Sequence, residues 1–178
     1  LSLIQKLSAP VNRMESLVQD LLLLTQLESN PVPPEMDEIK MRDLIQTAFN
    51  EVQGLVGSKD NLEINQTSDA RIRGINQEIS NALRYSPGGA NVIVSWSDTK
   101  DGKARFAVQD KGLGIAKEHL NRITERFYRV DMKDSRTRGG TGLGLAIVKH
   151  VLRRHNSELK VESSVGEGSL FYCDFETI

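Results

Sequence analysis

The chain contains a glycine-rich stretch that leads directly into a helical pattern. Residues 138–150 read RGGTGLGLAIVKH, and the apolar spacing of a helix begins at Leu143. Glycines let backbone N–H groups approach a ligand closely, and a helix N-terminus adds free donors and a partial positive charge. A phosphate is the natural ligand of such a stretch. A flexible turn before a helix accounts for the same residues, so the stretch alone leaves both interpretations open.

Two further segments carry side chains that suit a nucleotide. Residues 110–115, DKGLGI, follow a predicted strand, and a carboxylate beside glycines suits an exocyclic amine such as that of adenine. An ordinary Asp-x-Gly turn is the alternative. On the predicted helix 77–86, Asn81 could bind Mg²⁺ through its amide oxygen, Arg84 could reach phosphate and Tyr85 could pack on a base. A polar helix face is the alternative there.

The elements that must position these segments mix helices and strands. Apolar periodicity predicts helices over 41–55, 117–126 and 142–155, and strands over 62–65, 70–73, 91–96, 104–110, 160–163 and 169–175. Turn residues at 67–69, 101–102 and 166–168 separate neighbouring strands, and 127–141 predicts a basic loop. This order favours an α+β sandwich, in which helices cover one face of a mixed sheet.

The N-terminal segment predicts a long separate helix over residues 1–29. Its apolar stripe comprises Leu7, Val11, Met14, Val18 and Leu21, widened by Leu17, Leu24 and Leu27. Such a stripe must pack on other helices, on the body of the protein or on another copy. Pro10 predicts a kink or a fresh start of the helix, because proline lacks an N–H. Three prolines within residues 31–36 then predict a stiff linker and a domain boundary.

Composition excludes several classes of protein. The net charge of −1 and the pI near 6.4 argue against a general nucleic-acid binder. A single cysteine, Cys173, excludes an internal disulfide and a cysteine metal cluster, and its apolar surroundings predict a buried strand residue. The longest apolar run, residues 21–24, is too short to cross a membrane, so the fragment is expected to be soluble.

In this order the segments resemble the sensor histidine kinases, within the ATPase superfamily that includes gyrase-type and chaperone-type enzymes. Residues 81–86 look like the N box, 110–114 like the G1 box, 125–131 like the F box, 140–145 like the G2 box and 166–169 like the last glycine box. Residues 13–24, 122–131 and 146–151 are most similar to the phosphate-regulon branch of the family. The resemblance covers nearly the whole chain.

The resemblance implies that the chain binds ATP with Mg²⁺ under a lid at residues 128–141. The γ-phosphoryl group would pass to a histidine, for relay to an aspartate of a response regulator, in phosphate sensing. Asp110 would hold the adenine amine, and Asn81 would bind Mg²⁺. The implied ATP-binding residues are Asn81, Arg84, Tyr85, Asp110, Gly112, Gly114, Ile115, Phe127, Tyr128, Arg129, Gly140, Thr141, Gly142, Leu143, Gly144 and Leu145.

The same resemblance implies a domain plan and partners. Residues 1–30 would be the second helix of a dimerisation and phosphotransfer region, 31–36 a Pro-rich linker and 37–178 the catalytic ATP-binding domain. The chain would form a homodimer through the 1–30 helix and would act on a response regulator, with no nucleic-acid partner. The full-length protein would lie at the cytoplasmic side of the inner membrane, with any membrane contact made by segments outside this chain.

Two features depart from the family pattern. None of His119, His150 and His155 matches the phosphoacceptor box, so these are interpreted as surface or packing histidines and the acceptor is expected on a helix before residue 1. This chain alone should therefore bind ATP without forming its own phosphohistidine. The second departure is a short N box, because only a few residues separate Gly74 from Asn81. Asn81 could match an earlier position of that helix than the metal ligand.

Two other functions remain open at this point. The chain could be a catalytically impaired module of the same fold that acts in dimerisation or regulation, or it could be a gyrase-type or chaperone-type ATPase. The Phe-Tyr-Arg segment at 127–129 and the leucine-rich helix before the linker favour the sensor kinase over the other ATPases.

Overall fold

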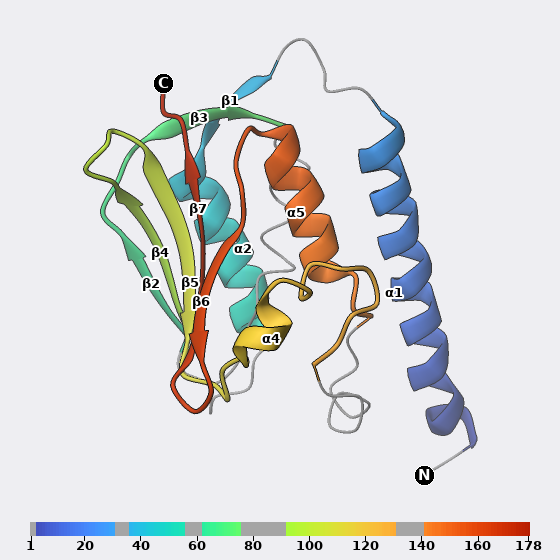
Figure 1. Cartoon of the computed structure of the whole chain (residues 1–178). Helices are drawn as coiled ribbons and strands as arrows, with labels where there is room; N and C mark the ends of the chain where they lie inside the picture. Colours follow the sequence, from blue (N-terminus) through green and yellow to red (C-terminus); the bar gives the residue numbers. More distant parts are fainter. Residues whose placement is uncertain (1–2, 31–35, 56–61, 76–91, 131–140) are drawn as a thin grey trace.

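The computed structural model describes residues 3–30, 36–55, 62–75, 92–130 and 141–178 (Figure 1). The elements in chain order are α1 (Leu3–Ser29), β1 (Asp37–Lys40), α2 (Met41–Leu55), β2 (Leu62–Gln66), β3 (Arg71–Gly74), β4 (Val92–Asp98), β5 (Ala104–Asp110), α4 (Lys117–Leu120), α5 (Gly144–Arg154), β6 (Lys160–Ser164) and β7 (Gly168–Phe175).

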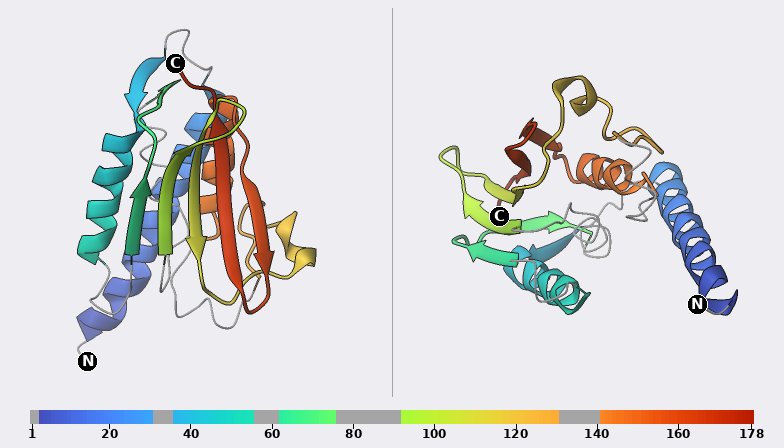
Figure 2. Two further views of the ribbon diagram at one scale, coloured as in Figure 1. Left: turned by 90° about the vertical axis from the view of Figure 1, so that its left-hand side faces the viewer. Right: turned by 90° about the horizontal axis from the view of Figure 1, so that it is seen from below.

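A five-stranded mixed sheet in the order β2-β4-β5-β7-β6 forms the centre of the domain. β2 runs parallel to β4, and the other neighbours are antiparallel. A separate pair, β1 and β3, forms a small antiparallel sheet. Helices α2 and α5 cover one face of the large sheet, and α1 lies on the far side of α5 (Figures 1 and 2). The predicted arrangement of helices on one face of a mixed sheet is therefore confirmed.

The core lies between this sheet and α5. The strands contribute Trp96, Cys173 and Phe175, and α5 contributes Ile147 and Val151, which are one helical turn apart and fully buried. Burying an aliphatic side chain of this size stabilises a fold by about 1.5–3 kcal/mol. Burial also raises the pKa of the Cys173 thiol to about 12, so the predicted buried strand cysteine is present as a neutral thiol.

Helix α1 packs on α5 through only part of its predicted apolar stripe. Leu24 and Leu27 join the core, whereas Met14, at 68% exposure, and Val18 are exposed. At the C-terminal end of α1, Arg154 Nη1 of α5 donates to the carbonyls of Leu27 (3.3 Å) and Asn30 (2.7 Å). These bonds satisfy carbonyls that a helix end leaves unpaired. Part of the apolar stripe therefore packs on the domain, and the rest of it is exposed to solvent.

The structure differs from two details of the predicted helices. The helix expected over residues 1–29 is present as α1, but of the kink or fresh start expected at Pro10 the fresh start does not occur, because α1 continues through this residue; the missing N–H removes a single bond from a helix of 27 residues. The helix expected over 117–126 ends at Leu120. There the chain tightens, since Arg122 N–H donates to His119 and Glu125 N–H to Arg122, each three residues back.

The strands at 62–65 and 70–73 were expected to flank a turn, and they belong to different sheets. The N–H groups of Thr67 and Ser68 both donate to the Trp96 carbonyl, and Ser68 Oγ donates to Asp98 (2.5 Å). The turn is therefore hydrogen-bonded to β4. β3 pairs instead with β1, a strand that the sequence did not predict. In the part of the chain that the structure describes, no helix is long and apolar enough to cross a bilayer.

The uncovered face of the sheet yields a pH-dependent prediction. Arg105 makes two hydrogen bonds to Asp174, at 2.6 and 3.0 Å, and Lys160 lies 3.2 Å from the same carboxylate. The bond from Arg105 is the main reason that the pKa of Asp174 lies below its ordinary value of 3.8. A carboxylate with a lowered folded-state pKa stabilises the fold above its unfolded pKa, and this stability is lost as the pH falls through the folded pKa.

We therefore expect the free energy of unfolding of Asp174→Asn to be lower than that of the wild type at pH 7 and to approach it below pH 3.8. Urea unfolding between pH 2.5 and 7 measures the difference. A gap between the two proteins that stays constant over this range would contradict the assignment.

Candidate functional site

Asp110 ends β5 and begins a tight loop. Its side chain is half-buried, and its Oδ1 accepts the N–H of Gly112 at 2.8 Å. Within the described parts of the chain, Oδ2 of Asp110 accepts no hydrogen bond. A Cβ added at Gly112 would lie 2.7 Å from Asp110 Oδ1. The loop thus presents one carboxylate oxygen as an acceptor, and glycine keeps the space beside it open.

The β6–β7 hairpin packs closely against this loop at two glycines, where backbone meets backbone. A Cβ at Gly114 would lie 1.9 Å from the Ser164 carbonyl oxygen, and a Cβ at Gly168 would lie 2.1 Å from the Asp110 carbonyl oxygen. Gly166 N–H also donates to the Leu113 carbonyl at 2.7 Å. Gly166 and Gly168 therefore do more than form a hairpin turn, because Gly168 lets the hairpin contact the backbone of Asp110.

The F-box segment meets the glycine-rich stretch. Phe127 adopts a left-handed conformation with φ of 61°, and its N–H donates to the Gly142 carbonyl at 3.0 Å. A Cβ at Gly142, where φ is 76°, would lie 3.0 Å from Phe127 Cα. Tyr128 is held beside them by a 2.6 Å bond between its hydroxyl and His119 Nδ1. The chain thus brings two predicted motifs into direct contact, and Arg129 next to them is half-buried.

The residues just before α5 are held in place by burial and by hydrogen bonds that reach helix α1. Leu143 is fully buried, and its N–H donates to Thr141 Oγ1 at 3.3 Å. Thr141 in turn donates to Asp20 Oδ2 of α1 at 2.7 Å, and Asp20 is only 5% exposed. Gly144 and Leu145, the first residues of α5, are half-buried. Because the first N–H groups of a helix have no partner within it, this end of α5 suits an anion.

Several predicted site residues lie outside the described parts of the chain. These are Asn81, Arg84, Tyr85 and Gly140, together with most of the lid and of the linker. The predicted Mg²⁺ ligand is among them. Among the described residues there is no group of three or more His, Cys, Asp or Glu side chains that could hold a metal ion. The described residues that fit a nucleotide are therefore the carboxylate at Asp110, its glycine cradle and the start of α5.

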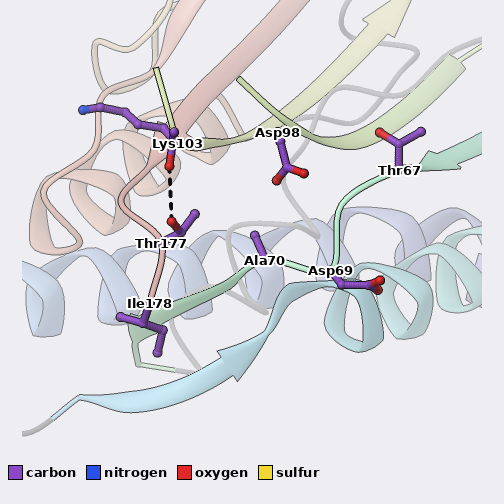
Figure 3. A pocket seen from close by; sticks show the side chains of 8 residues that line it. Thr67, Asp69, Ala70, Asp98, Lys103, Thr177 and Ile178 are labelled. Atoms are coloured by element: carbon purple, nitrogen blue, oxygen red, sulfur yellow. Dashed lines mark hydrogen bonds between the residues drawn. The ribbon is translucent and has the colours of Figure 1, made fainter. Parts of the chain in front are cut away.

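A cavity of about 500 Å³ lies at the opposite end of β5. The turn after β2, the β4–β5 hairpin and the chain end line it, and Thr177 there donates to the Gly102 carbonyl at 3.2 Å (Figure 3). Gly102 precedes the first residue of β5, whereas Asp110 is the last, so about 20 Å of strand separates them. This cavity is not part of the Asp110 site.

The three histidines contact other parts of the domain. His155 is buried, and its Nε2 accepts the N–H of Ile75 at 2.9 Å, so the ring proton lies on Nδ1, which donates to the Val151 carbonyl at 2.7 Å. His150 Nε2 lies 3.3 Å from Glu28 of α1, and burial lowers the pKa of His150 despite this carboxylate. Their contacts fit packing roles.

Sequence reasoning missed the polar residues by which α1 reaches the site. Asp20 and Glu28 lie on the face that carries Leu24 and Leu27, and Glu28 pairs with Arg126 beside Phe127. A signal was present, since Asp20 precedes Leu24 and Leu27 by four and seven residues. A carboxylate on an apolar helix face indicates a specific partner.

The comparisons with known proteins give a consistent result. The family described as "Histidine kinase-, DNA gyrase B-, and HSP90-like ATPase" matches residues 71–177. The chain is 36% identical over 181 residues to the phosphate regulon sensor protein PhoR of Pseudomonas aeruginosa, over 97% of the chain and 41% of PhoR. It is also 36% identical over 179 residues to the sensor-like histidine kinase SenX3 of Mycolicibacterium smegmatis, over 94% of the chain and 46% of SenX3. The chain therefore spans less than half the length of these relatives.

Solved structures show the same fold. The histidine kinase AdeS of Acinetobacter baumannii matches with a TM-score of 0.74 at 19% identity, over 97% of this chain and 83% of AdeS. Full-length ShkA, solved in complex with AMPPNP, matches with a TM-score of 0.73 at 23% identity, over 91% of this chain and 35% of ShkA.

The hairpin glycines offer a matched pair of variants. Gly166 and Gly168 both have positive φ, but a Cβ at Gly166 meets nothing within 4 Å, whereas one at Gly168 strikes the Asp110 carbonyl. We expect Gly166→Ala to cost about 1 kcal/mol of unfolding free energy and Gly168→Ala about 3 kcal/mol or more. Chemical denaturation measures both, and equal costs would show that the close approach does not matter.

Proposed function

Because the chain belongs to the histidine kinase-, DNA gyrase B- and HSP90-like ATPase family, we propose that it is the ATP-binding catalytic region of a sensor histidine kinase. In this function the region holds ATP while the γ-phosphoryl group passes to a histidine, in a protein that senses phosphate. The observation that carries the proposal is the Asp110 carboxylate, set at a strand end in a cradle that only glycines allow.

The proposed base site is built around Asp110. One carboxylate oxygen is engaged by Gly112 N–H, which leaves the other to accept the adenine amine. Gly112 keeps a side chain out of the space beside the carboxylate, and Gly114 lets the loop lie against the hairpin. Ile115 would line the base. Tyr85 would pack on the ring.

The proposed phosphate site lies at the start of α5. Gly140, Gly142 and Gly144 let the phosphates approach the backbone, and the N–H groups from Thr141 to Leu145 stabilise their charge. Arg84 and Arg129 add positive charge, while Phe127 and Tyr128 support the base of the lid. Asn81 would hold Mg²⁺, which supplies charge neutralisation at the transferring phosphoryl group.

The acceptor and the partners are part of the same proposal. The acceptor histidine lies on a helix of the full-length protein that precedes residue 1, and the phosphoryl group then passes to an aspartate of a response regulator. Residues 1–30 form a homodimer through the exposed face of α1, which carries Val11, Met14, Val18 and Leu22. The linker at 31–36 joins this helix to the domain at 37–178, on the cytoplasmic side of the inner membrane.

Asp110→Asn tests the base site with little change in shape. We expect it to weaken ATP binding by about tenfold to a hundredfold, because a charged hydrogen bond contributes about 1.5–3 kcal/mol. Isothermal titration calorimetry with a non-hydrolysable ATP analogue and Mg²⁺ measures this. Asp101→Asn is the control, since it removes the same charge from the exposed hairpin at the other end of β5.

Unchanged affinity in Asp110→Asn would reject Asp110 as the base ligand. No binding by the wild-type chain at millimolar analogue would reject the kinase function for this chain and favour the impaired regulatory module.

Phosphotransfer can be tested separately from binding. A longer version of the protein that includes the preceding helix, and that carries Asp110→Asn, supplies the acceptor, and the wild-type 178-residue chain supplies ATP binding. Mixing them with radiolabelled ATP should place an acid-labile label on the longer protein. Intact ATP binding with no label would contradict transfer by this domain.

A further inference from the structure

The hydroxyl of Ser163 on β6 joins three segments of the site. Its Oγ lies 2.8 Å from the Ile115 backbone nitrogen, 2.8 Å from the Gly168 carbonyl oxygen and 2.9 Å from Ser169 Oγ. These partners belong to the loop after Asp110 and to β7. No motif of the sequence pointed to Ser163.

The roles of the three bonds follow from the number of available protons. A serine hydroxyl donates one hydrogen bond and accepts two. The Gly168 carbonyl only accepts, so it takes the Ser163 proton, and the Ile115 N–H only donates. Ser169 must therefore donate to Ser163. Every hydrogen-bonding site of the Ser163 hydroxyl is used, which fixes its orientation.

Among the described residues, this hydroxyl accepts one of the two hydrogen bonds that join residues 111–115 of the loop to the hairpin. The other joins Gly166 N–H to the Leu113 carbonyl and uses backbone alone. Ser163 bonds to Ile115, at the end of the loop, and to Gly168, whose α-carbon lies against the Asp110 carbonyl at its start. A single side chain therefore connects both ends of the segment that carries the carboxylate.

We propose that Ser163 is a positioning residue for adenine recognition, which holds the loop of residues 110–115 so that the Asp110 carboxylate faces the 6-amino group of the base. This inference rests on the proposed function. Ser163 itself does not touch the nucleotide. Without its oxygen, the Ile115 N–H and the Gly168 carbonyl lose this partner. The end of the loop at Ile115 is then held less firmly, while the bond from Gly166 N–H to the Leu113 carbonyl remains.

The test compares two nucleotides on each variant. One is ATP, and the other is purine riboside triphosphate, which lacks only the 6-amino group. In Ser163→Ala we expect ATP affinity to fall about tenfold and affinity for the analogue to change less than about twofold. A purely structural role would weaken both nucleotides equally, so the ratio of the two dissociation constants separates positioning from stability.

Ser157→Ala is the matched control. Ser157 is buried, and its hydroxyl donates to the Asp174 carbonyl at 2.9 Å, at the other end of β7. It should lose similar stability and keep the wild-type preference for ATP. Ser163→Thr retains a hydroxyl and should restore that preference. If Ser163→Ala does not fold, Ser163→Cys keeps the volume with a weak acceptor and should lower the preference in the same direction.

The possible failures are distinguishable. If the wild type prefers ATP and the folded Ser163 variants prefer it equally, the inference is overturned and the proposed function stands. If the wild type binds ATP no better than the analogue, Asp110 does not read the amino group, and the base assignment and the inference fail together.

Discussion

The contact between the loop that follows β5 and the β6–β7 hairpin is the constraint on which the site depends. It joins backbone to backbone, with Gly114 against the Ser164 carbonyl and Gly168 against the Asp110 carbonyl. No side chain other than hydrogen fits at either glycine, so two segments about fifty residues apart are held at a fixed distance. The sheet supplies the same relation through pairing, because Asp110 lies opposite Ser169 in the β5–β7 ladder. The direction of the Asp110 side chain is thus set by β-sheet register and by glycine contacts.

Packing of helix α5 on the core fixes the position of the glycine-rich turn at its start, which is the proposed phosphate site. Its inner side packs on the sheet through Ile147 and Val151, and its outer side meets Leu24 of α1. Leu143, immediately before the helix, is fully buried, so the glycine-rich turn is anchored by an apolar residue at its centre. Glycines that permit close approach are therefore compatible with a well-defined helix start, because burial supplies the order that glycine lacks.

The sequence predicted the parts of the fold that have local causes. Strand alternation and the Asp-Gly turn gave the β4–β5 hairpin, and the helix at 41–55 was located to the residue. The strands at 62–65 and 70–73 were found, but their pairing was not, since a backbone bond from Thr67 to Trp96 has no signal in either segment. The contact of Phe127 with Gly142 and the three bonds of Ser163 also escaped prediction, because each depends on segments that meet only after folding. The motif order did identify the family, and the described motifs do lie around one end of the fold.

The bond between Thr141 and Asp20 links the position of α1 to whatever occupies the start of α5. The Thr141 hydroxyl has one proton, which it gives to Asp20, and it accepts the Leu143 N–H. An anion that takes that N–H competes with the hydroxyl and places negative charge beside a buried carboxylate. Coupled equilibria are reciprocal. If docking of α1 lowers the affinity of this end of α5 for the anion by some factor, binding of the anion lowers the equilibrium constant for docking of α1 by the same factor. Because both equilibria involve Thr141, the docking of α1 and the binding of the anion should report the same coupling free energy.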